Sequence, residues 1–217
     1  MLKYNFKNIK LNKEICEFIG AYIGDGYLAH YEKHQYIIGI SGDKKRDDDY
    51  LKNYLTPLIK RNFPFTKPRL YYRNDENTLM LRINSKKLYG IFIKLGFHKG
   101  KKSRNIKIPE NILKNEKFMN ATLRGIFDTD GSVFLDKRHS YKNPYPRITL
   151  QLSSQALIGQ LENYLSMNFK LYVNKSNRDG YRNYIEIYGH GQLETFLKQI
   201  GFSNKRHLNK IKNASVA

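Results

Sequence analysis

Two aspartates that each close an apolar, helix-like segment are the residues of this chain best suited to chemistry. Asp25 comes near the end of residues 18–26, and Asp130 takes the same place in residues 123–131; each is followed by glycine. A carboxylate in the last turn of a helix is disfavoured because the helix dipole is negative there. Two such carboxylates side by side repel each other unless cations lie between them, and hard divalent cations bind carboxylates. The pair predicts a divalent metal site, with Mg²⁺ as the physiological ion.

The two segments are copies of one element in a chain that repeats itself. Residue 18 corresponds to residue 123, and the Gly-Phe pair at residues 96–97 recurs at residues 201–202 with the same offset. Between these anchors both halves run in one order, which is a helix, two strands, a helix, two strands and a helix. This order predicts an α+β fold of two pseudo-symmetric αββαββα units.

The repeat also sets the expected domain boundaries. The first unit is predicted at residues 1–103 and the second at residues 118–217, with a linker at 104–117 that contains Pro109. Within the units, several segments alternate apolar and polar residues with period two, so each sheet is expected to have one polar, wet face. The predicted strands are 27–31, 36–41, 69–73, 78–84, 132–137, 147–153, 171–174 and 184–188.

Small residues at helical spacing indicate how the two Asp-Gly helices are arranged. Gly20 and Gly24 share one face of the first helix, and Gly125 and Thr129 occupy the equivalent places in the second. Glycine inside a solvent-facing helix costs about 1 kcal/mol relative to alanine, so the pattern favours close packing of the two backbones. The glycine after each aspartate is predicted to end its helix by adopting a positive φ.

The composition indicates a polyanionic partner. The 217 residues include 39 Lys and Arg against 19 Asp and Glu, a net charge of +20. Because 40% of the residues are hydrophobic, the chain can bury a core, which excludes a disordered basic tail. The single cysteine, Cys16, excludes an internal disulfide, and no apolar run reaches the ~18 residues needed to span a bilayer. We therefore expect nucleic acid rather than a membrane as the partner.

The two segments resemble the nine-letter motif of the LAGLIDADG homing endonuclease family. Residues 18–26 match its third, eighth and ninth letters, and residues 123–131 match the first, third, sixth, eighth and ninth. The departures are Ile23 at the sixth letter of the first copy and Arg124 at the second letter of the second copy. With two motifs, the chain resembles the single-chain members of the family, which work as monomers on double-stranded DNA.

The resemblance implies a site and a mechanism. Asp25 and Asp130 stand at the eighth letter, which is the metal-binding catalytic position of the family, and each is expected to act with the preceding backbone carbonyl, that of Gly24 or Thr129. The bound Mg²⁺, or another divalent ion such as Mn²⁺, would activate a water for hydrolysis of a phosphodiester bond in each strand. By position after the Gly-Phe pairs, the expected catalytic basic residues are Lys101 and Lys205.

The resemblance further implies that two curved antiparallel sheets, packed through the motif helices, lie along the DNA. Residues of the predicted strands or beside the Gly-Phe pairs are then expected to contact base edges or phosphates. These residues are Arg69, Tyr71, Arg73, Arg82, Arg147, Gln151, Asn183, Glu186, Lys102 and Arg206. The three acids at residues 47–49 precede an apolar segment and are predicted to complement a helix N-terminus, without a catalytic role.

Two functions remain open from the sequence. The first is an intron-encoded, site-specific endonuclease that cuts a long, partly asymmetric target. The second is a binding protein of the same fold, either an RNA splicing maturase or a DNA-binding protein that has lost cleavage. Retention of Asp25 and Asp130 favours the enzyme, because a pure binder needs no pair of repelling acids. The expected location is inside the cell with the host DNA, in the cytoplasm of a prokaryote or an organelle of a eukaryote.

Overall fold

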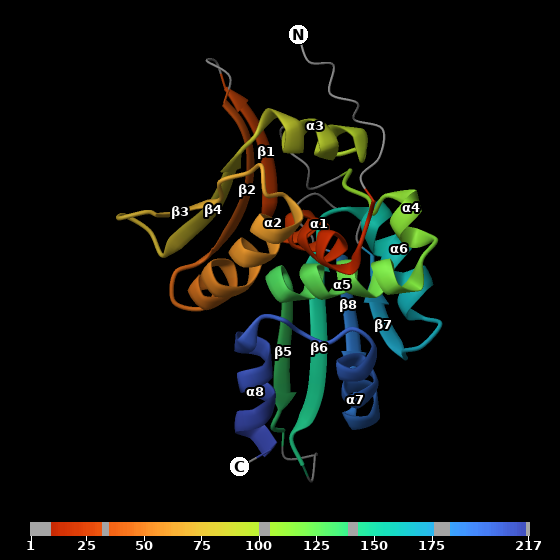
Figure 1. Ribbon diagram of the computed structural model, residues 1–217. Helices are drawn as coiled ribbons and strands as arrows, with labels where there is room; N and C mark the ends of the chain where they lie inside the picture. Colours follow the sequence, from red (N-terminus) through yellow and green to blue (C-terminus); the bar gives the residue numbers. More distant parts are fainter. Residues whose placement is uncertain (1–9, 32–34, 100–104, 139–142, 176–182, 216–217) are drawn as a thin grey trace.

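The computed structural model describes residues 10–31, 35–99, 105–138, 143–175 and 183–215 (Figure 1). Two four-stranded antiparallel sheets flank a central pair of helices, α1 (Lys13–Asp25) and α5 (Glu116–Thr129). The predicted α+β fold of two repeated units is confirmed.

The first unit continues from α1 with the order that the repeat predicts. Its sheet has the strand order β1-β2-β4-β3, so the outer strand β3 pairs with β4. The elements after α1 are β1 (Gly26–Tyr31), β2 (Gln35–Asp43), the π-helix η1 (Tyr50–Leu55), α2 (Thr56–Asn62), β3 (Arg69–Tyr72), β4 (Thr78–Asn84) and α3 (Lys86–Lys94).

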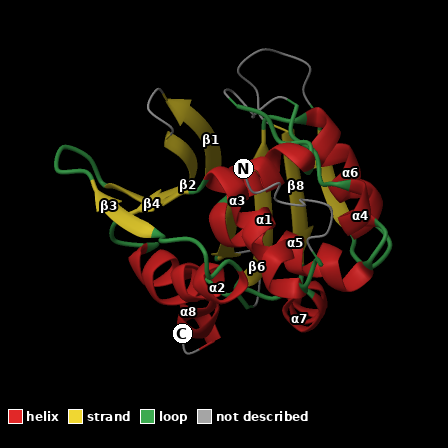
Figure 2. Cartoon of the chain, turned by 45° about the horizontal axis from the view of Figure 1, so that its top comes forward, coloured by secondary structure: helices red, strands yellow, loops and turns green. Residues whose placement is uncertain are grey.

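The second unit has the equivalent strand order β5-β6-β8-β7. Its elements are α4 (Glu110–Leu113), α5, β5 (Gly131–Asp136), β6 (Tyr145–Leu152), α6 (Gln155–Leu165), β7 (Leu171–Asn174), β8 (Asn183–Tyr188), α7 (His190–Gln199) and α8 (Lys205–Ser215). The last helix, α8, lies beyond the predicted repeat. It runs beside β5, and Figures 1 and 2 both place it on the same side of the molecule as η1 and α2 of the first unit.

Each sheet has the predicted dry and wet faces. In β4 the side chains of Leu79, Leu81 and Ile83 are buried, whereas the intervening Met80 and Arg82 are on the other face. The buried faces and the helices form one continuous apolar core, and both motif helices belong to it. Alternation with period two therefore identified the buried side of the strands correctly.

The motif helices meet with their backbones in contact, as the small residues predict. A Cβ atom added to Gly20 would lie 2.0 Å from the carbonyl oxygen of Thr122, and one added to Gly125 would lie 2.1 Å from that of Glu17. Both distances are far below van der Waals contact, so only glycine fits either position at this helix separation.

The glycines after the two aspartates do not adopt the predicted positive φ. Gly26 has a φ of −87°, and among the described residues positive φ at glycine is confined to Gly96, Gly189 and Gly201. Glycine is required at these two positions for a steric reason instead. The chain turns there from the helix directly into the first strand of each sheet, which leaves no room for a Cβ atom. A Cβ at Gly26 would lie 2.5 Å from the Tyr22 carbonyl oxygen, and one at Gly131 would lie 2.4 Å from the Phe127 carbonyl oxygen.

The segment predicted as a linker, residues 104–117, is more structured than a simple connection. It contains α4 and the first two residues of α5. Before α4, the side chain of Gln160 accepts a hydrogen bond from the Ile108 amide at 2.8 Å and donates one to the Ile108 carbonyl at 3.1 Å. These two bonds hold the segment against α6.

Candidate functional site

The candidate site is at the ends of the two motif helices, whose starts are fixed by asparagine caps. The Asn12 side chain accepts a hydrogen bond from the Ile15 amide at 2.8 Å, and the Asn115 side chain accepts one from the Phe118 amide at 3.1 Å. Such caps satisfy amides that the helix itself leaves unpaired. Since both helices also pack backbone to backbone, their last turns are held side by side.

The four residues predicted to bind metal are brought together at these last turns. The Asp130 Oδ2 atom lies 3.5 Å from the position of a Cβ on Gly24, and the Thr129 Oγ1 atom lies 2.0 Å from it. The acid-bearing end of α5 therefore contacts the equivalent end of α1. Asp25 and Asp130 are both half-buried.

The donor atoms at this place suit a hard divalent ion that shares its coordination with a substrate. The predicted ligands are carboxylate and carbonyl oxygens, the donors that Mg²⁺ and Ca²⁺ prefer. Within the described part of the chain, no group of three or more His, Cys, Asp or Glu side chains forms a complete metal site. Mg²⁺ normally binds through one or two carboxylates together with waters and substrate phosphates. The residues fit that kind of site.

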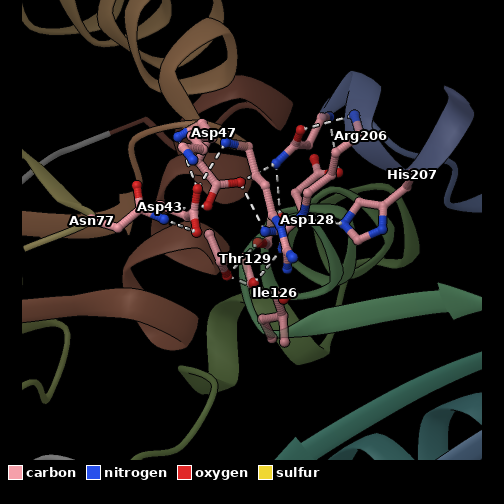
Figure 3. A network of polar contacts seen from close by, with 12 residues as sticks. Asp43, Asp47, Asn77, Ile126, Asp128, Thr129, Arg206 and His207 are labelled. Carbon is pink, nitrogen blue, oxygen red and sulfur yellow. Dashed lines mark hydrogen bonds and ion pairs between the residues drawn. The ribbon is translucent and has the colours of Figure 1, made fainter. Parts of the chain in front are cut away.

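Beside Asp130, a polar network joins the end of α5 to α8 and to the first unit (Figure 3). Arg206 Nη2 donates to the carbonyl oxygens of Thr129, at 2.7 Å, and Asp128, at 3.0 Å. Its Nη1 atom lies 2.9 Å from Asp47 Oδ1 in the first unit. Arg206, which we expected to contact DNA, therefore caps the second motif helix.

Asp128, at the sixth letter of the second motif, holds the segment that leads into α8. Its carboxylate accepts hydrogen bonds from the backbone amides of Ser203 and Asn204 at 3.0 to 3.1 Å, and the side chain is fully buried. Burial raises the pKa of the Asp128 carboxyl to about 8, against the lowering effect of these two amides. Asp128 thus has a structural task separate from that of Asp130.

Asp47 belongs to the run of acids that precedes η1, and it has contacts that the sequence did not show. It does more than complement a helix N-terminus, because its carboxylate accepts from the Asp43 amide at 3.0 Å and from the Asn204 side chain at 2.9 Å, as well as pairing with Arg206. The run of acids at residues 47–49 was the visible signal. Its partners come from the opposite end of the chain, so only the folded structure could identify them.

The other basic residues expected at the site, where the structure describes them, are not seen in contact with the ends of the motif helices. Lys101 and Lys102 lie outside the described residues. Lys205, the first residue of α8, has an exposed side chain whose Nζ atom lies 3.1 Å from Asp49 Oδ2. It is next to Arg206 in the chain but does not share the contacts of Arg206 with the end of α5.

On the wet face of the first sheet, cationic and aromatic side chains gather around one hollow. Arg69 and Arg82 are direct partners across β3 and β4, and the Arg82 guanidinium lies 5.1 Å from the centre of the Tyr71 ring. The hollow has a volume of about 380 Å³ and is also lined by Lys67 and Asn84. Arg73 follows the end of β3 and pairs instead with acids of the adjoining loop, including Glu76 at 3.4 Å.

The wet face of the second sheet is different in charge. Arg147 is held by two carboxylates, pairing with Glu186 and with Asp136, whose Oδ2 atom is 3.1 Å from Arg147 Nε. Gln151 is exposed on this face, as expected. Asn183 is not on it: the strand begins one residue earlier than predicted, and the buried Asn183 side chain donates to the Leu152 carbonyl at 3.2 Å.

Comparison with known proteins places this arrangement in a class. Residues 117–201 match the family model of the LAGLIDADG-like domain. The fold is that of the homing endonuclease I-DmoI in complex with DNA and Mn, with 18% identity, 87% of this chain and 96% of that chain covered, and a TM-score of 0.62. The homing endonuclease I-WcaI, bound to its DNA recognition sequence, is similar over 93% of this chain and 88% of its own, with 18% identity and a TM-score of 0.56. The chain thus shares the two-unit fold of these homing endonucleases, as its repeat indicated.

Sequence relatives come mostly from much longer proteins. The chain is 31% identical over 212 residues to the replication factor C small subunit of Methanocaldococcus jannaschii, covering 95% of this chain but 10% of that protein. It is 26% identical to an uncharacterized protein of the same organism, covering 80% of this chain and 63% of that one. The chain thus spans less than two thirds of either relative. Among its described residues, no helix is long and apolar enough to cross a membrane.

Proposed function

We propose that this chain is a site-specific, metal-dependent DNA endonuclease of the homing type. It binds a long, partly asymmetric double-stranded target as a monomer and hydrolyses both strands. We also propose that it is encoded within an intron and acts inside the cell on the host DNA, in the cytoplasm of a prokaryote or an organelle of a eukaryote. The fold and the LAGLIDADG-like match support this proposal.

The observation that carries the proposal is the contact between two acid-bearing helix ends. Asp130 Oδ2 lies 3.5 Å from the Cβ position of Gly24, so a second carboxylate site adjoins the first across the pseudo-symmetry axis. A protein that only binds DNA gains nothing from two acids facing a polyanion. Two half-sites between two sheets are what cleavage of two strands requires.

In this mechanism each half-site consists of an aspartate and the preceding carbonyl. Asp25 with the Gly24 carbonyl, and Asp130 with the Thr129 carbonyl, would hold Mg²⁺ or Mn²⁺ against the scissile phosphate. A divalent ion held by these residues would supply an activated water and charge stabilisation for the leaving 3′ oxygen. Lys205, and Lys101 outside the described residues, would add positive charge for the phosphate.

The sheets supply recognition of the target. The longest strand of each half, β2 with nine residues or β6 with eight, rises about 26 to 30 Å, which approaches one turn of B-DNA, so the footprint should be roughly 20 base pairs. Arg69, Tyr71 and Arg82 in the first half, and Arg147, Gln151 and Glu186 in the second, are proposed to face the major groove. Because these two sets differ, the target should be only partly palindromic.

The test is cleavage of a supercoiled plasmid that carries the insertion site of the chain's own gene, with Mg²⁺. We expect a double-strand break, and we expect Asp25→Asn and Asp130→Asn to reduce cleavage by orders of magnitude while gel-shift affinity is retained. If both variants cut at the wild-type rate, the acids are only helix ends. If the wild type binds this DNA, or the intron RNA, without cutting, the chain is a regulator or maturase instead.

A further inference from the structure

We propose that Arg206, anchored by Asp47, is the positioning residue of the second half-site, which consists of Asp130 and the Thr129 carbonyl. This inference rests on the proposed function, because it assigns Arg206 a task at a site whose metal chemistry is itself proposed. It goes beyond that function by naming how the second half-site is kept in place and which part of the molecule controls it.

The first argument is the contact between Arg206 and the end of α5. The last carbonyls of a helix have no partner within the helix and are free to tilt. Here Arg206 Nη2 donates to the carbonyls of Thr129, at 2.7 Å, and Asp128, at 3.0 Å. A guanidinium is a rigid planar fork, so one nitrogen bonded to both oxygens fixes their relative direction. The Thr129 carbonyl therefore has its orientation set by a residue of α8.

The second argument is that Arg206 is itself held, and from the other unit. Its Nη1 atom lies 2.9 Å from Asp47 Oδ1, and the two side chains are only 19% and 10% exposed. Asp47 is fixed in turn by the Asp43 amide at 3.0 Å and the Asn204 side chain at 2.9 Å. A chain of short contacts thus runs from the end of β2 to Thr129, as Figure 3 shows.

These contacts have a consequence for only one half of the site. The Thr129 carbonyl belongs to the peptide bond that leads into Asp130, so a change in its direction also turns the Asp130 backbone. A displacement of about 1 Å at a reacting centre is enough to slow a reaction by about 10²-fold. Loosening Arg206 should therefore slow cleavage of the strand that depends on Asp130 and spare the other strand.

The decisive variant is Asp47→Asn, which keeps the size of the side chain and leaves Arg206 in place but removes the charge that anchors it. The matched control is Asp48→Asn, which removes one charge from the same loop, because the Asp48 carboxylate accepts a hydrogen bond from the exposed Tyr72 hydroxyl at 2.6 Å and pairs with neither Arg206 nor Lys205. An exposed hydrogen bond contributes little, so the control should behave like the wild type.

The main measurement is single-turnover cleavage of each strand, with the Asp130-dependent strand assigned from Asp130→Asn. We expect Asp47→Asn to slow that strand about tenfold or more relative to the other, and Asp48→Asn to leave the ratio unchanged. Arg206→Lys, which keeps the charge but loses the fork, should show the same strand bias. Equal slowing of both strands, or none, in a folded Asp47→Asn variant would overturn the inference.

A second measurement does not depend on cleavage. Mn²⁺ binding to each protein, followed by electron paramagnetic resonance, should weaken about threefold or more in Asp47→Asn and remain unchanged in Asp48→Asn. If the wild type binds Mn²⁺ through Asp130 but cuts no DNA, the proposed function fails and this titration still tests Arg206. If Asp47→Asn binds Mn²⁺ like the wild type and only melts at a lower temperature, the network is a structural contact and the inference is wrong.

Discussion

Arg124 of α5 pairs with Glu17 of α1, with Nη1 lying 3.4 Å from Oε2 and the glutamate side chain only 3% exposed. The repeat aligns Glu17 with Thr122 and Arg124 with Ile19, so the pseudo-symmetric position holds no charge. The pair can therefore form only when a first unit packs against a second unit. Two copies of the same unit would lack it. Arg124, which departs from the second motif letter, has this role in the interface.

Removing one partner of this pair should lower the free energy of unfolding more than removing both. Arg124→Met leaves Glu17 buried without its cation, although the Ser203 hydroxyl still donates to it at 2.6 Å. We expect a loss of about 3 kcal/mol in the free energy of unfolding, most of it recovered when Glu17→Met is added. Urea unfolding of the single and double variants measures this. Additive losses would show that the two side chains do not act as a pair.

The close contact of the motif helices predicts opposite effects of alanine at two helical glycines. Gly20→Ala should destabilise the protein by several kcal/mol, because its Cβ would meet the Thr122 carbonyl at 2.0 Å. Gly159→Ala, in α6, has no atom within 4 Å of its Cβ and should stabilise the helix by about 1 kcal/mol. Thermal melting of both variants is the measurement. A Gly20→Ala variant as stable as the wild type would rule out this helix separation.

The buried imidazole of His207 is expected to lower the free energy of unfolding in mild acid. Burial lowers the pKa of its imidazole to about 3, from an ordinary value of 6.5, and the ring is stacked on Phe202. Below pH 6.5 the unfolded chain takes up a proton at His207 that the folded chain does not, so the contribution of this group to the free energy of unfolding falls as the pH drops from 6.5 toward 3. The slope approaches about 1.4 kcal/mol per pH unit from this group. Asp128, whose pKa is raised by burial, acts in the opposite sense below pH 8.

The measurement for His207 is urea unfolding at pH 7 and pH 5. His207→Gln should lose less stability, or gain more, than the wild type when the pH falls from 7 to 5, whereas His98→Gln, at an exposed position, should behave as the wild type does. An unchanged difference between the two pH values in His207→Gln would mean that the buried imidazole is not responsible.

The charge difference between the two sheets predicts unequal electrostatic contributions to DNA binding. Within the described part of the chain, Arg69 and Arg82 form no ion pair with a carboxylate, whereas Arg147 is held by Asp136 and Glu186. Arg82→Gln should weaken binding and reduce the slope of log affinity against log salt by about 1. Arg147→Gln should change that slope less. Fluorescence anisotropy at several salt concentrations tests this, and equal changes would contradict it.

The sequence by itself determined the elements and the centre of the molecule. The spacing of Gly20, Gly24 and Gly125 required close helix packing, and alternation of residue types identified the buried side of each strand. These features follow from local periodicity and from the size of a side chain, which the chain carries at every position. The repeat then placed Asp25 and Asp130 at equivalent positions before any tertiary contact was known.

Only the tertiary structure decided the surroundings of that centre. Arg206 and Asp47 lie far apart in the sequence. Arg206 stands in a basic helix and Asp47 in a run of acids, and neither setting indicates a specific partner. Whether an ionisable side chain faces solvent, DNA or another side chain depends on which distant segment packs against it. The position of α8 beside the first unit decides the partners of Arg206. Because the side chain is largely buried there, it pairs with Asp47 and with the end of α5 instead of facing solvent.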